Sequence, residues 1–367
     1  MTNPGRNGPL AGLRVVEMAA IGPVPFAGTM LASMGAEILR IERPGKTFSD
    51  ADVTAQGREF VTLDLKDPAD QARALDLIAA ADLLLEGFRP GVMERLGLGP
   101  EKAHARNPGL VYCRMTGWGQ EGPLASAPGH DINYIAITGA LHAIGTAAQP
   151  VQPLNLVGDY GGGALYLVVG ALAALREAAA TGRGQVVDAA MCDGALNLML
   201  PYAAGRNSGG WVGEREKNVL DGGAHFYGVF ECADGRFFSL GAIEPQFYAE
   251  LRRLCGLDGP EWDAQLDKSA WPGLREKLRA VMKTKTRDEW TAILEGSDVC
   301  AAPVLEFDEA KTHPHLVARG AFVDGPGGPQ PAAAPRFSAH KRHTPARPPA
   351  APLAVDDAVA RWTDAKK

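Results

Sequence analysis

The chain has 367 residues and a formal net charge of −6 at pH 7; 46% of the residues are hydrophobic and 22% are charged. This length predicts two domains of a globular protein, and the negative charge argues against nucleic acid as the main partner. The best apolar segment, Ala164–Leu175, falls short of the roughly 18 residues of a membrane span, so no membrane partner is expected. Five scattered cysteines and a polar start without a signal-peptide core predict reduced thiols and a cytoplasmic location.

The first third of the chain alternates short apolar segments with helical segments. Strands are predicted at Leu13–Met18, Ala36–Ile41, Phe60–Leu65, Ala81–Glu86 and Leu110–Met115. Helices are predicted at Pro23–Met34, at Pro68–Ala80 with Asp67 as its cap, and at Gly91–Leu96. This alternation is typical of βαβ units and predicts an α/β fold with a doubly wound, Rossmann-like parallel sheet.

The rest of the chain changes character twice. A brief strand at Val186–Val187 precedes Ala189–Leu200, a helix that is apolar nearly all round and is therefore predicted to be buried. Two strands, Tyr227–Cys232 and Arg236–Gly241, flank a turn and predict a hairpin. Helices are predicted after the hairpin at Pro245–Leu254, Leu274–Met282 and Arg287–Leu294.

These patterns divide the chain into two domains. Residues 1–188 form the predicted large domain, which residues 330–367 complete. Residues 225–305 form a smaller α+β domain, and residues 189–224 and 306–329 are predicted linkers. The Pro- and Ala-rich segment Gly325–Leu353 is expected to be mostly irregular.

The first candidate site is Gly129-His130-Asp131-Ile132-Asn133-Tyr134, at a predicted helix start. Backbone N–H groups at such a start have no intrahelical acceptor and could stabilise a thioester oxygen as it becomes an enolate. The adjacent imidazole could remove or return a proton on the neighbouring carbon. The same residues also fit an ordinary helix capped by Asp131, with His130 on the surface.

The second candidate is Asp159, the one acid in the stretch of small and apolar residues 155–163. A carboxyl in such surroundings is a usable acid or base near neutral pH. Asn155 lies four residues earlier, so on a helix it would share the face of Asp159 and could orient it. The alternative is a helix cap followed by a tight helix contact.

Charged residues follow several predicted strands. Glu244 precedes a proline at a helix start, where an acid is common with or without a function. Four cations occupy strand–helix junctions, namely Arg43, Lys66, Arg89 and Arg95. If they converge at the carboxyl edge of the sheet, they suit a polyanionic ligand such as a nucleotide diphosphate; otherwise they are solvated surface.

Two groups of histidines are assigned no chemistry. His313 and His315 have no third ligand nearby, so no metal site is predicted. The basic segment His340-Lys341-Arg342-His343 lies in the irregular C-terminal region and is interpreted as solvated surface.

Four segments follow one another in a specific order: Leu10–Glu17, Gly35–Pro44, Leu63–Lys66 and Phe88–Gly97. Together they resemble the family III CoA-transferase superfamily, and the likeness extends from Leu10 to about Arg361. His130 in Gly-His-Asp-Ile-Asn-Tyr and Glu244 in Gly-Ala-Ile-Glu-Pro-Gln-Phe-Tyr resemble its α-methylacyl-CoA racemase branch. The chain departs from that branch at His225, where proline is common, at Gly228, where aspartate is common, and over Phe48–Gln56.

The resemblance implies racemisation or epimerisation, a 1,1-proton transfer at the carbon α to a CoA thioester through an enolate. His130 and Asp159 would act on opposite faces of that carbon. Glu244 would hold His130, Asn155 would position Asp159, and the backbone N–H of Asp131 would receive the enolate oxygen. The CoA-binding residues implied are Arg43, Leu63, Asp64, Leu65, Lys66, Phe88, Arg89, Arg95, Gly129 and Tyr134.

The resemblance also implies an acyl-CoA of lipid metabolism as substrate, no separate cofactor, and an interlocked homodimer. Each site would then combine the large domain of one chain with the small domain of the other. Two alternatives stay open. One is an acyl-CoA:carboxylate CoA-transferase with Asp159 as covalent nucleophile, and the other is a CoA-ester-binding homologue without turnover.

Overall fold

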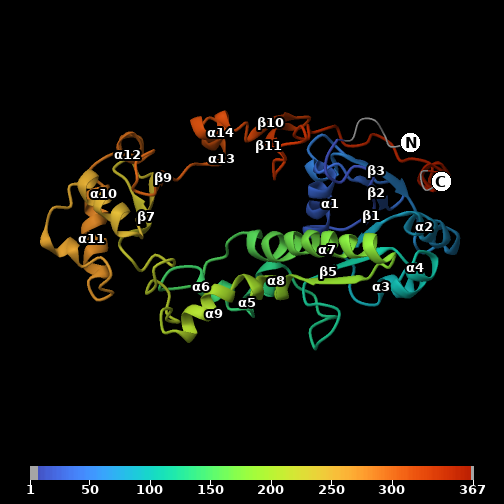
Figure 1. Cartoon of the computed structure of the whole chain (residues 1–367), viewed down its shortest axis with the longest axis horizontal. Helices are drawn as coiled ribbons and strands as arrows, with labels where there is room; N and C mark the ends of the chain where they lie inside the picture. The colour runs from blue at the N-terminus through green and yellow to red at the C-terminus, as the bar shows by residue number, and fades with distance from the viewer. Residues whose placement is uncertain (1–6, 365–367) are drawn as a thin grey trace. The chain divides into compact units, whose positions relative to one another are not determined.

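The computed structural model describes residues 7–364, which divide into two compact units (Figure 1). Of these residues, 7–140, 153–199 and 318–364 form the first unit, and 141–152 and 200–317 form the second. The first unit therefore extends beyond residue 188, the predicted end of the large domain. A short excursion after Ala140 belongs to the second unit.

A six-stranded parallel sheet organises the first unit, in the order β3-β2-β1-β4-β5-β6. Its strands are β1 (Arg14–Met18), β2 (Glu37–Glu42), β3 (Arg58–Thr62), β4 (Leu83–Glu86), β5 (Val111–Thr116) and β6 (Val186–Ala190). This arrangement confirms the predicted doubly wound fold. The strand order reverses between β1 and β4, and the carboxyl ends of these strands flank the crevice in which such sheets bind ligands.

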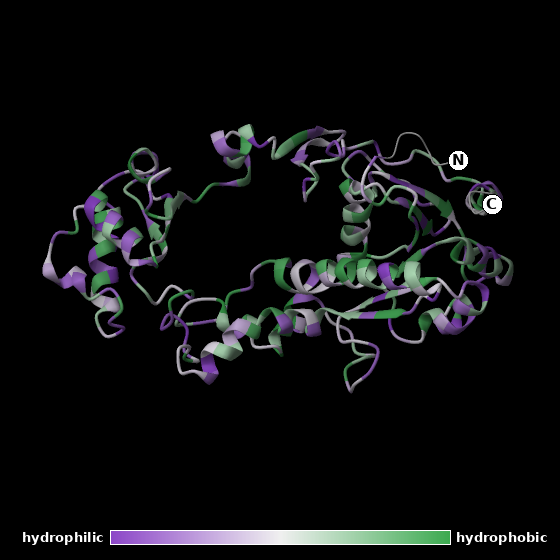
Figure 2. Ribbon diagram, in the orientation of Figure 1, coloured by the Kyte–Doolittle hydropathy of each residue, from purple (hydrophilic) through white to green (hydrophobic). Residues whose placement is uncertain are grey.

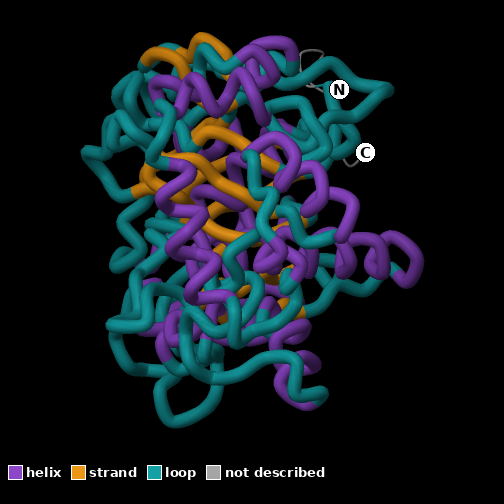
Figure 3. Tube along the Cα trace, turned by 90° about the vertical axis from the view of Figure 1, so that its left-hand side faces the viewer, coloured by secondary structure: helices purple, strands orange, loops and turns teal. Residues whose placement is uncertain are grey.

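Helices cover both faces of this sheet, and strand side chains alternate between two cores, with Val15 in one and Val16 in the other. One face carries α1 (Pro23–Ser33) and α7 (Leu165–Thr181). The other face carries α2 (Pro68–Ala80), α4 (Pro100–Arg106) and α15 (Val355–Asp364). Because both faces are covered, the strands are apolar along most of their length, and helices flank the orange strands in Figure 3.

Leu156–Thr181 forms one continuous helix, in which the π-helical turns of η2 (Leu156–Ala164) lead into α7. This helix has 26 residues, and an 18-residue window of it has a mean hydropathy of 1.5, so by length and composition it could cross a membrane. The sequence prediction concerned uncharged segments, of which Ala164–Leu175 was named the best, whereas this helix also contains Asp159, Arg176 and Glu177. The inner side of α7 packs on β5 and β6, and a single helix of this kind is weak evidence for a membrane span. Its apolar colouring is visible in Figure 2.

The predicted buried helix at Ala189–Leu200 is two helices, α8 (Met191–Leu198) and α9 (Leu200–Asn207). Gly194 of α8 lies against Gly162 of η2, where an added Cβ would be 1.9 Å from the Gly162 carbonyl oxygen. The prediction of burial on all sides was wrong, since Leu196 is 57% exposed. An apolar helix surface indicates that something covers it, but not that the cover belongs to the same chain.

The second unit is built on an antiparallel sheet of β7 (Tyr227–Glu231), β8 (Phe237–Gly241) and β9 (Ala301–Pro303). The predicted hairpin is β7–β8. Three helices follow as predicted, α10 (Pro245–Cys255), α11 (Trp271–Met282) and α12 (Arg287–Leu294). The sequence did not indicate β9, because its three residues, Ala-Ala-Pro, have neither alternation nor β-branched side chains.

The predicted return linker contains regular structure. Its elements are α13 (Phe307–Ala310), α14 (Pro314–Ala318) and a hairpin of β10 (Phe322–Gly325) and β11 (Gly328–Pro331). Residues 332–354 then form neither helix nor strand and lead into α15, so Gly325–Leu353 is mostly irregular as predicted, although β11 lies within it. We refer to residues 332–354 as the strap.

Candidate active site

A cavity of about 640 Å³ opens at the carboxyl ends of β1, β4 and β5. Its walls come from the loops after these strands, from the start of α5 (Asp131–Ala136) and from η2. Seven predicted site residues line it, namely Phe88, Arg89, Gly129, His130, Tyr134, Asn155 and Asp159. The volume suits a small ligand or part of a cofactor, and the position is the one expected for this sheet topology.

His130 stands at the N-cap of α5, where its side chain is exposed at the cavity. Its backbone N–H donates to Asn133 Oδ1 at 3.1 Å. The Tyr134 hydroxyl donates to the Gly129 carbonyl, and a Cβ on Gly129 would lie 2.7 Å from the Tyr134 ring. The turn before His130 is therefore fixed by contacts that only glycine allows.

Asp131 connects α5 to η2 through its carboxylate. Its Oδ1 accepts the backbone N–H of Gly158 at 2.8 Å and of Asp159 at 2.9 Å. Burial raises the pKa of Asp131, and these two donors oppose that rise. The prediction gave Asp131 a backbone role or, as the alternative, the role of helix cap. Instead, His130 is the N-cap of α5, and the Asp131 side chain holds the turn that carries Asp159 beside α5.

Asp159 is half-buried in the π-helical η2, a kind of distortion that is common at functional sites. Asn155 Nδ2 donates to Asp159 Oδ2 at 3.0 Å, the pairing that the four-residue spacing suggested. On the other side, an added Cβ on Gly22 would lie 3.2 Å from the same oxygen. The carboxylate therefore lies close to both Asn155 and Gly22, the N-cap of α1.

The loop after β4 carries Phe88 and Arg89 into the cavity wall. Glu86, at the end of β4, accepts the Phe88 N–H at 2.7 Å with one oxygen. Its other oxygen accepts Arg114 Nε at 3.0 Å, and both side chains are buried. This buried pair fixes the start of the loop and so the wall of the cavity.

Comparisons with known proteins agree with this geometry. A sequence model described as CoA-transferase family III matches residues 10–354. Alpha-methylacyl-CoA racemase of Mus musculus is 43% identical over 350 residues, which cover 95% of this chain and 89% of that protein. Succinyl-CoA–D-citramalate CoA-transferase of Chloroflexus aurantiacus is 30% identical over 335 residues, which cover 86% of this chain and 83% of that protein.

A solved structure of similar fold also matches the chain. It is a CAIB/BAIF family protein from Brucella suis, with a TM-score of 0.81 and 25% identity, and the match covers 98% of this chain and 100% of that one. The chain belongs to CoA-transferase family III.

Other predicted CoA ligands of this family III protein lie outside the cavity lining. Arg43 and Lys66 are exposed beyond β2 and β3, and Arg95 is exposed at the end of α3 (Val92–Arg95). Leu63 is buried and Leu65 half-buried in the core. Asp64 Oδ1 accepts the Lys66 N–H at 3.1 Å and so shapes the turn after β3.

Glu244 lies in the second unit, at the N-cap of α10, and its side chain is exposed. His130 is in the first unit, so the proposed contact between these two residues stays a prediction.

Sequence reasoning missed several residues that line the cavity, among them Gly22, Trp118 and Tyr160. Gly22 and Trp118 come soon after β1 and β5, so the rule that ligands meet the carboxyl ends of strands could have found them. Tyr160 stacks on Phe26 with ring centroids 4.6 Å apart, a contact that no local pattern indicates.

Proposed function

We propose that this family III protein is an α-methylacyl-CoA racemase. The observation that carries the proposal is that His130 and Asp159 line one cavity, with Asp131 joining the segments from which they come. The similarity to the mouse racemase supplies the substrate class, a 2-methyl-branched acyl-CoA.

The reaction inverts the carbon next to a thioester carbonyl. Its proton is weakly acidic, and its removal leaves a planar enolate. Returning a proton to the opposite face requires one proton-transfer group on each face. We assign these roles to the imidazole of His130 and the carboxyl of Asp159, which exchange base and acid roles with the hand of the substrate.

The negative charge that develops on the thioester oxygen needs a donor. The Asp131 N–H is the first of α5, so it has no acceptor within the helix. We assign this N–H to the enolate oxygen. Since α5 has only six residues, the assignment rests on this hydrogen bond and not on a helix dipole.

The CoA part of the substrate is assigned to the carboxyl edge of the sheet. Arg43 and Lys66 follow β2 and β3, and Arg95 ends α3, the helix after β4. All three are exposed, which suits contacts with the CoA phosphates. Phe88 and Leu63 would flank the adenine or the pantetheine. The proposal needs no cofactor beyond the CoA that the substrate carries.

We further propose a homodimer. Large apolar side chains are exposed on the outer sides of α7 and α8, where Val169 is 65% and Leu196 57% exposed. A second copy would bury them. Val169→Asp should yield monomers in analytical ultracentrifugation, whereas Val53→Asp, at another exposed valine, should leave the dimer intact. A wild-type protein that sediments as a monomer would contradict the dimer.

The proposed activity is tested by α-proton exchange. Both hands of a panel of 2-methylacyl-CoA esters are incubated in deuterated water with the protein and no second substrate, and followed by NMR. Exchange with inversion is expected, and His130→Ala should abolish exchange for at least one hand. Full exchange of both hands by that variant would exclude His130 as a base.

The transferase alternative keeps one specific observation in its favour, because Asp159 lines the cavity and could act as a nucleophile. An acyl-aspartyl anhydride would be trapped by hydroxylamine and detected by mass spectrometry. Trapping at Asp159 together with absent exchange would replace the racemase by a transferase. If neither trapping nor exchange is observed, the remaining alternative is a homologue that binds CoA esters without turnover.

A further inference from the structure

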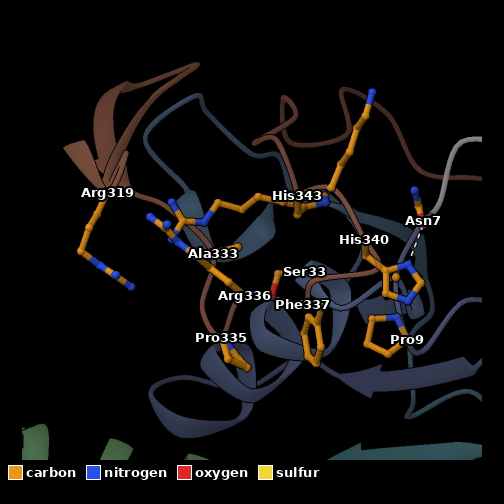
Figure 4. A pocket seen from close by; sticks show the side chains of 13 residues that line it. Asn7, Pro9, Ser33, Arg319, Ala333, Pro335, Arg336, Phe337, His340 and His343 are labelled. Carbon is orange, nitrogen blue, oxygen red and sulfur yellow. Dashed lines mark hydrogen bonds between the residues drawn. The ribbon is translucent and has the colours of Figure 1, made fainter. Parts of the chain in front are cut away.

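A second cavity, of about 250 Å³, lies in the first unit and shares no lining residue with the first (Figure 4). It is enclosed by residues 7–9, by Ser33 at the end of α1, by Arg319 and by residues 333–343 of the strap. The segment 7–9 precedes β1, and α1 ends before β2. The cavity is therefore at the amino edge of the sheet, opposite the candidate active site.

The charged groups at this cavity are all cations. They are Arg319, Arg336, Lys341 and Arg342, and two histidines, His340 and His343, lie among them. Among the described residues that line the cavity there is no aspartate or glutamate. The interpretation of the segment 340–343 as solvated surface was wrong, because the strap folds its side chains around a cavity. Three of the four residues, His340, Arg342 and His343, are half-buried.

Arg342 is the centre of this cluster. Burial lowers the pKa of Arg342, and the positive charges of Arg336 and Arg319 lower it further. One guanidinium nitrogen donates to the Gly320 carbonyl, while its Nε is buried and has no hydrogen-bond partner among residues 7–364. Like charges held together at partial burial destabilise one another unless an anion lies among them.

The end of α1 does not account for the cluster. A helix C-terminus carries about half a negative charge, whereas four cationic residues line this cavity and the charges of Arg336 and Arg319 act on Arg342. Acidic partners within the chain do not account for it either. Arg347, farther along the strap, lies 3.5 Å from Asp50, but none of the four cavity cations forms an ion pair with a described acid.

We propose that this cavity binds a small phosphorylated compound that carries at least two negative charges. Guanidinium groups donate paired hydrogen bonds that match phosphate oxygens, and several cations favour a multiply charged anion. The cavity of about 250 Å³ corresponds to roughly eight waters at ~30 Å³ each, enough for a pyrophosphate but not for a whole CoA. Phe337 and Pro335 give it an apolar wall against which an organic group would pack.

The test is isothermal titration calorimetry of the full chain with inorganic pyrophosphate. One pyrophosphate per chain is expected, with at least tenfold weaker binding by the double variant Arg336→Gln, Arg342→Gln. Arg347→Gln is the matched control, because it removes an arginine of the same strap that does not line the cavity. Pyrophosphate bound at the CoA edge of the sheet would be unaffected by either change.

Folding of the double variant is checked by its α-proton exchange, which should be unchanged because the two cavities share no lining residue. If that variant does not fold, Lys341→Gln replaces it, since Lys341 is exposed and its loss should weaken binding about threefold. Competition by adenosine 3′,5′-bisphosphate would identify a nucleotide as the source of the phosphates, and failure to compete would leave a free phosphate compound. No binding of pyrophosphate, or equal binding by the double variant and the wild type, would overturn the proposal.

Discussion

Two histidines in different units are held in opposite environments. His130 is exposed at a cavity, where it can meet a ligand. His225 is fully buried in the second unit, and its Nε2 lies 2.7 Å from the Tyr248 hydroxyl. That hydroxyl donates to the Trp262 carbonyl at 3.0 Å, so it accepts from His225 Nε2–H.

The second unit thus fixes both the tautomer and the charge of its histidine. His225 Nδ1 is buried without a hydrogen-bond partner in the described chain, so a proton there would have no acceptor. Burial, with the charge of Arg275, lowers the pKa of His225 to about 4. The contrast shows that a histidine is available for proton transfer only where the fold leaves its ring open to a ligand.

The largest expected effect comes from removing the acid that lines the same cavity as the exposed histidine. Asp159→Asn keeps the shape of the side chain but cannot exchange a proton. Loss of one proton-transfer group should slow α-exchange by about 10²–10⁴-fold, as measured by NMR in deuterated water. Asp76→Asn, at a surface acid paired with Arg106, is the control and should leave the rate unchanged. A rate within twofold of the wild type would remove Asp159 from the reaction.

The next test distinguishes the role of the Asp131 side chain from the role of its backbone N–H. Asp131→Ala deprives the N–H groups of Gly158 and Asp159 of their acceptor, which should cost on the order of 3 kcal/mol of stability. The same change should slow exchange at least tenfold. Asp131→Asn retains an oxygen acceptor and should recover most of the stability in urea denaturation. Equal losses in both variants would contradict a role of this acceptor.

The buried histidine predicts acid sensitivity of the second unit. His225 has a pKa of about 4 in the fold and an ordinary value of 6.5, so between these values the unfolded chain binds more protons. Stability is therefore complete above pH 6.5 and falls as the pH drops toward 4, by about 2–3 kcal/mol at pH 4.5.

His225→Phe should abolish this part of the pH dependence. The pH dependence of stability is measured by urea unfolding at pH 7 and pH 4.5. Tryptophan fluorescence reports on this unit, because Trp262 and Trp271 lie in the core of the second unit. An unchanged difference between the two pH values in the variant would show that other groups cause the acid loss.

The smallest effect is expected at Gly22, whose φ of +67° is unfavourable for other residues. Gly22→Ala should cost on the order of 1 kcal/mol and slow exchange a few-fold, because the new Cβ would lie 3.2 Å from Asp159 Oδ2. Gly235→Ala is the matched control, since its φ is +74° and nothing lies within 4 Å of its added Cβ. If both variants slow exchange alike, the effect is general strain and not the contact with Asp159.

Much of the fold in both units could be predicted where the signals are local. Pro68–Ala80 was bounded correctly, since Asp67 accepts the Ala69 N–H at 2.8 Å just ahead of the proline. The β7–β8 hairpin was likewise indicated by a turn between two apolar segments. Residues 306–329 were predicted as a linker, although α13, α14 and β10 form there and β11 begins there, because segments of four or five residues leave too little periodicity to detect.

The candidate site likewise has features that the sequence indicates and features that only the tertiary structure sets. Order and spacing along the chain were enough to single out His130, Asp159 and Asn155, because a proton-transfer group is recognised by its residue type and its neighbours. That His130 and Asp159 line one cavity, that the Asp131 carboxylate joins their segments, and that the basic segment 340–343 encloses a second cavity were decided by the tertiary structure. The reason is physical: a strand or a cap depends on interactions over a few residues, whereas a cavity depends on chain segments whose separation in sequence carries no information about their distance in space.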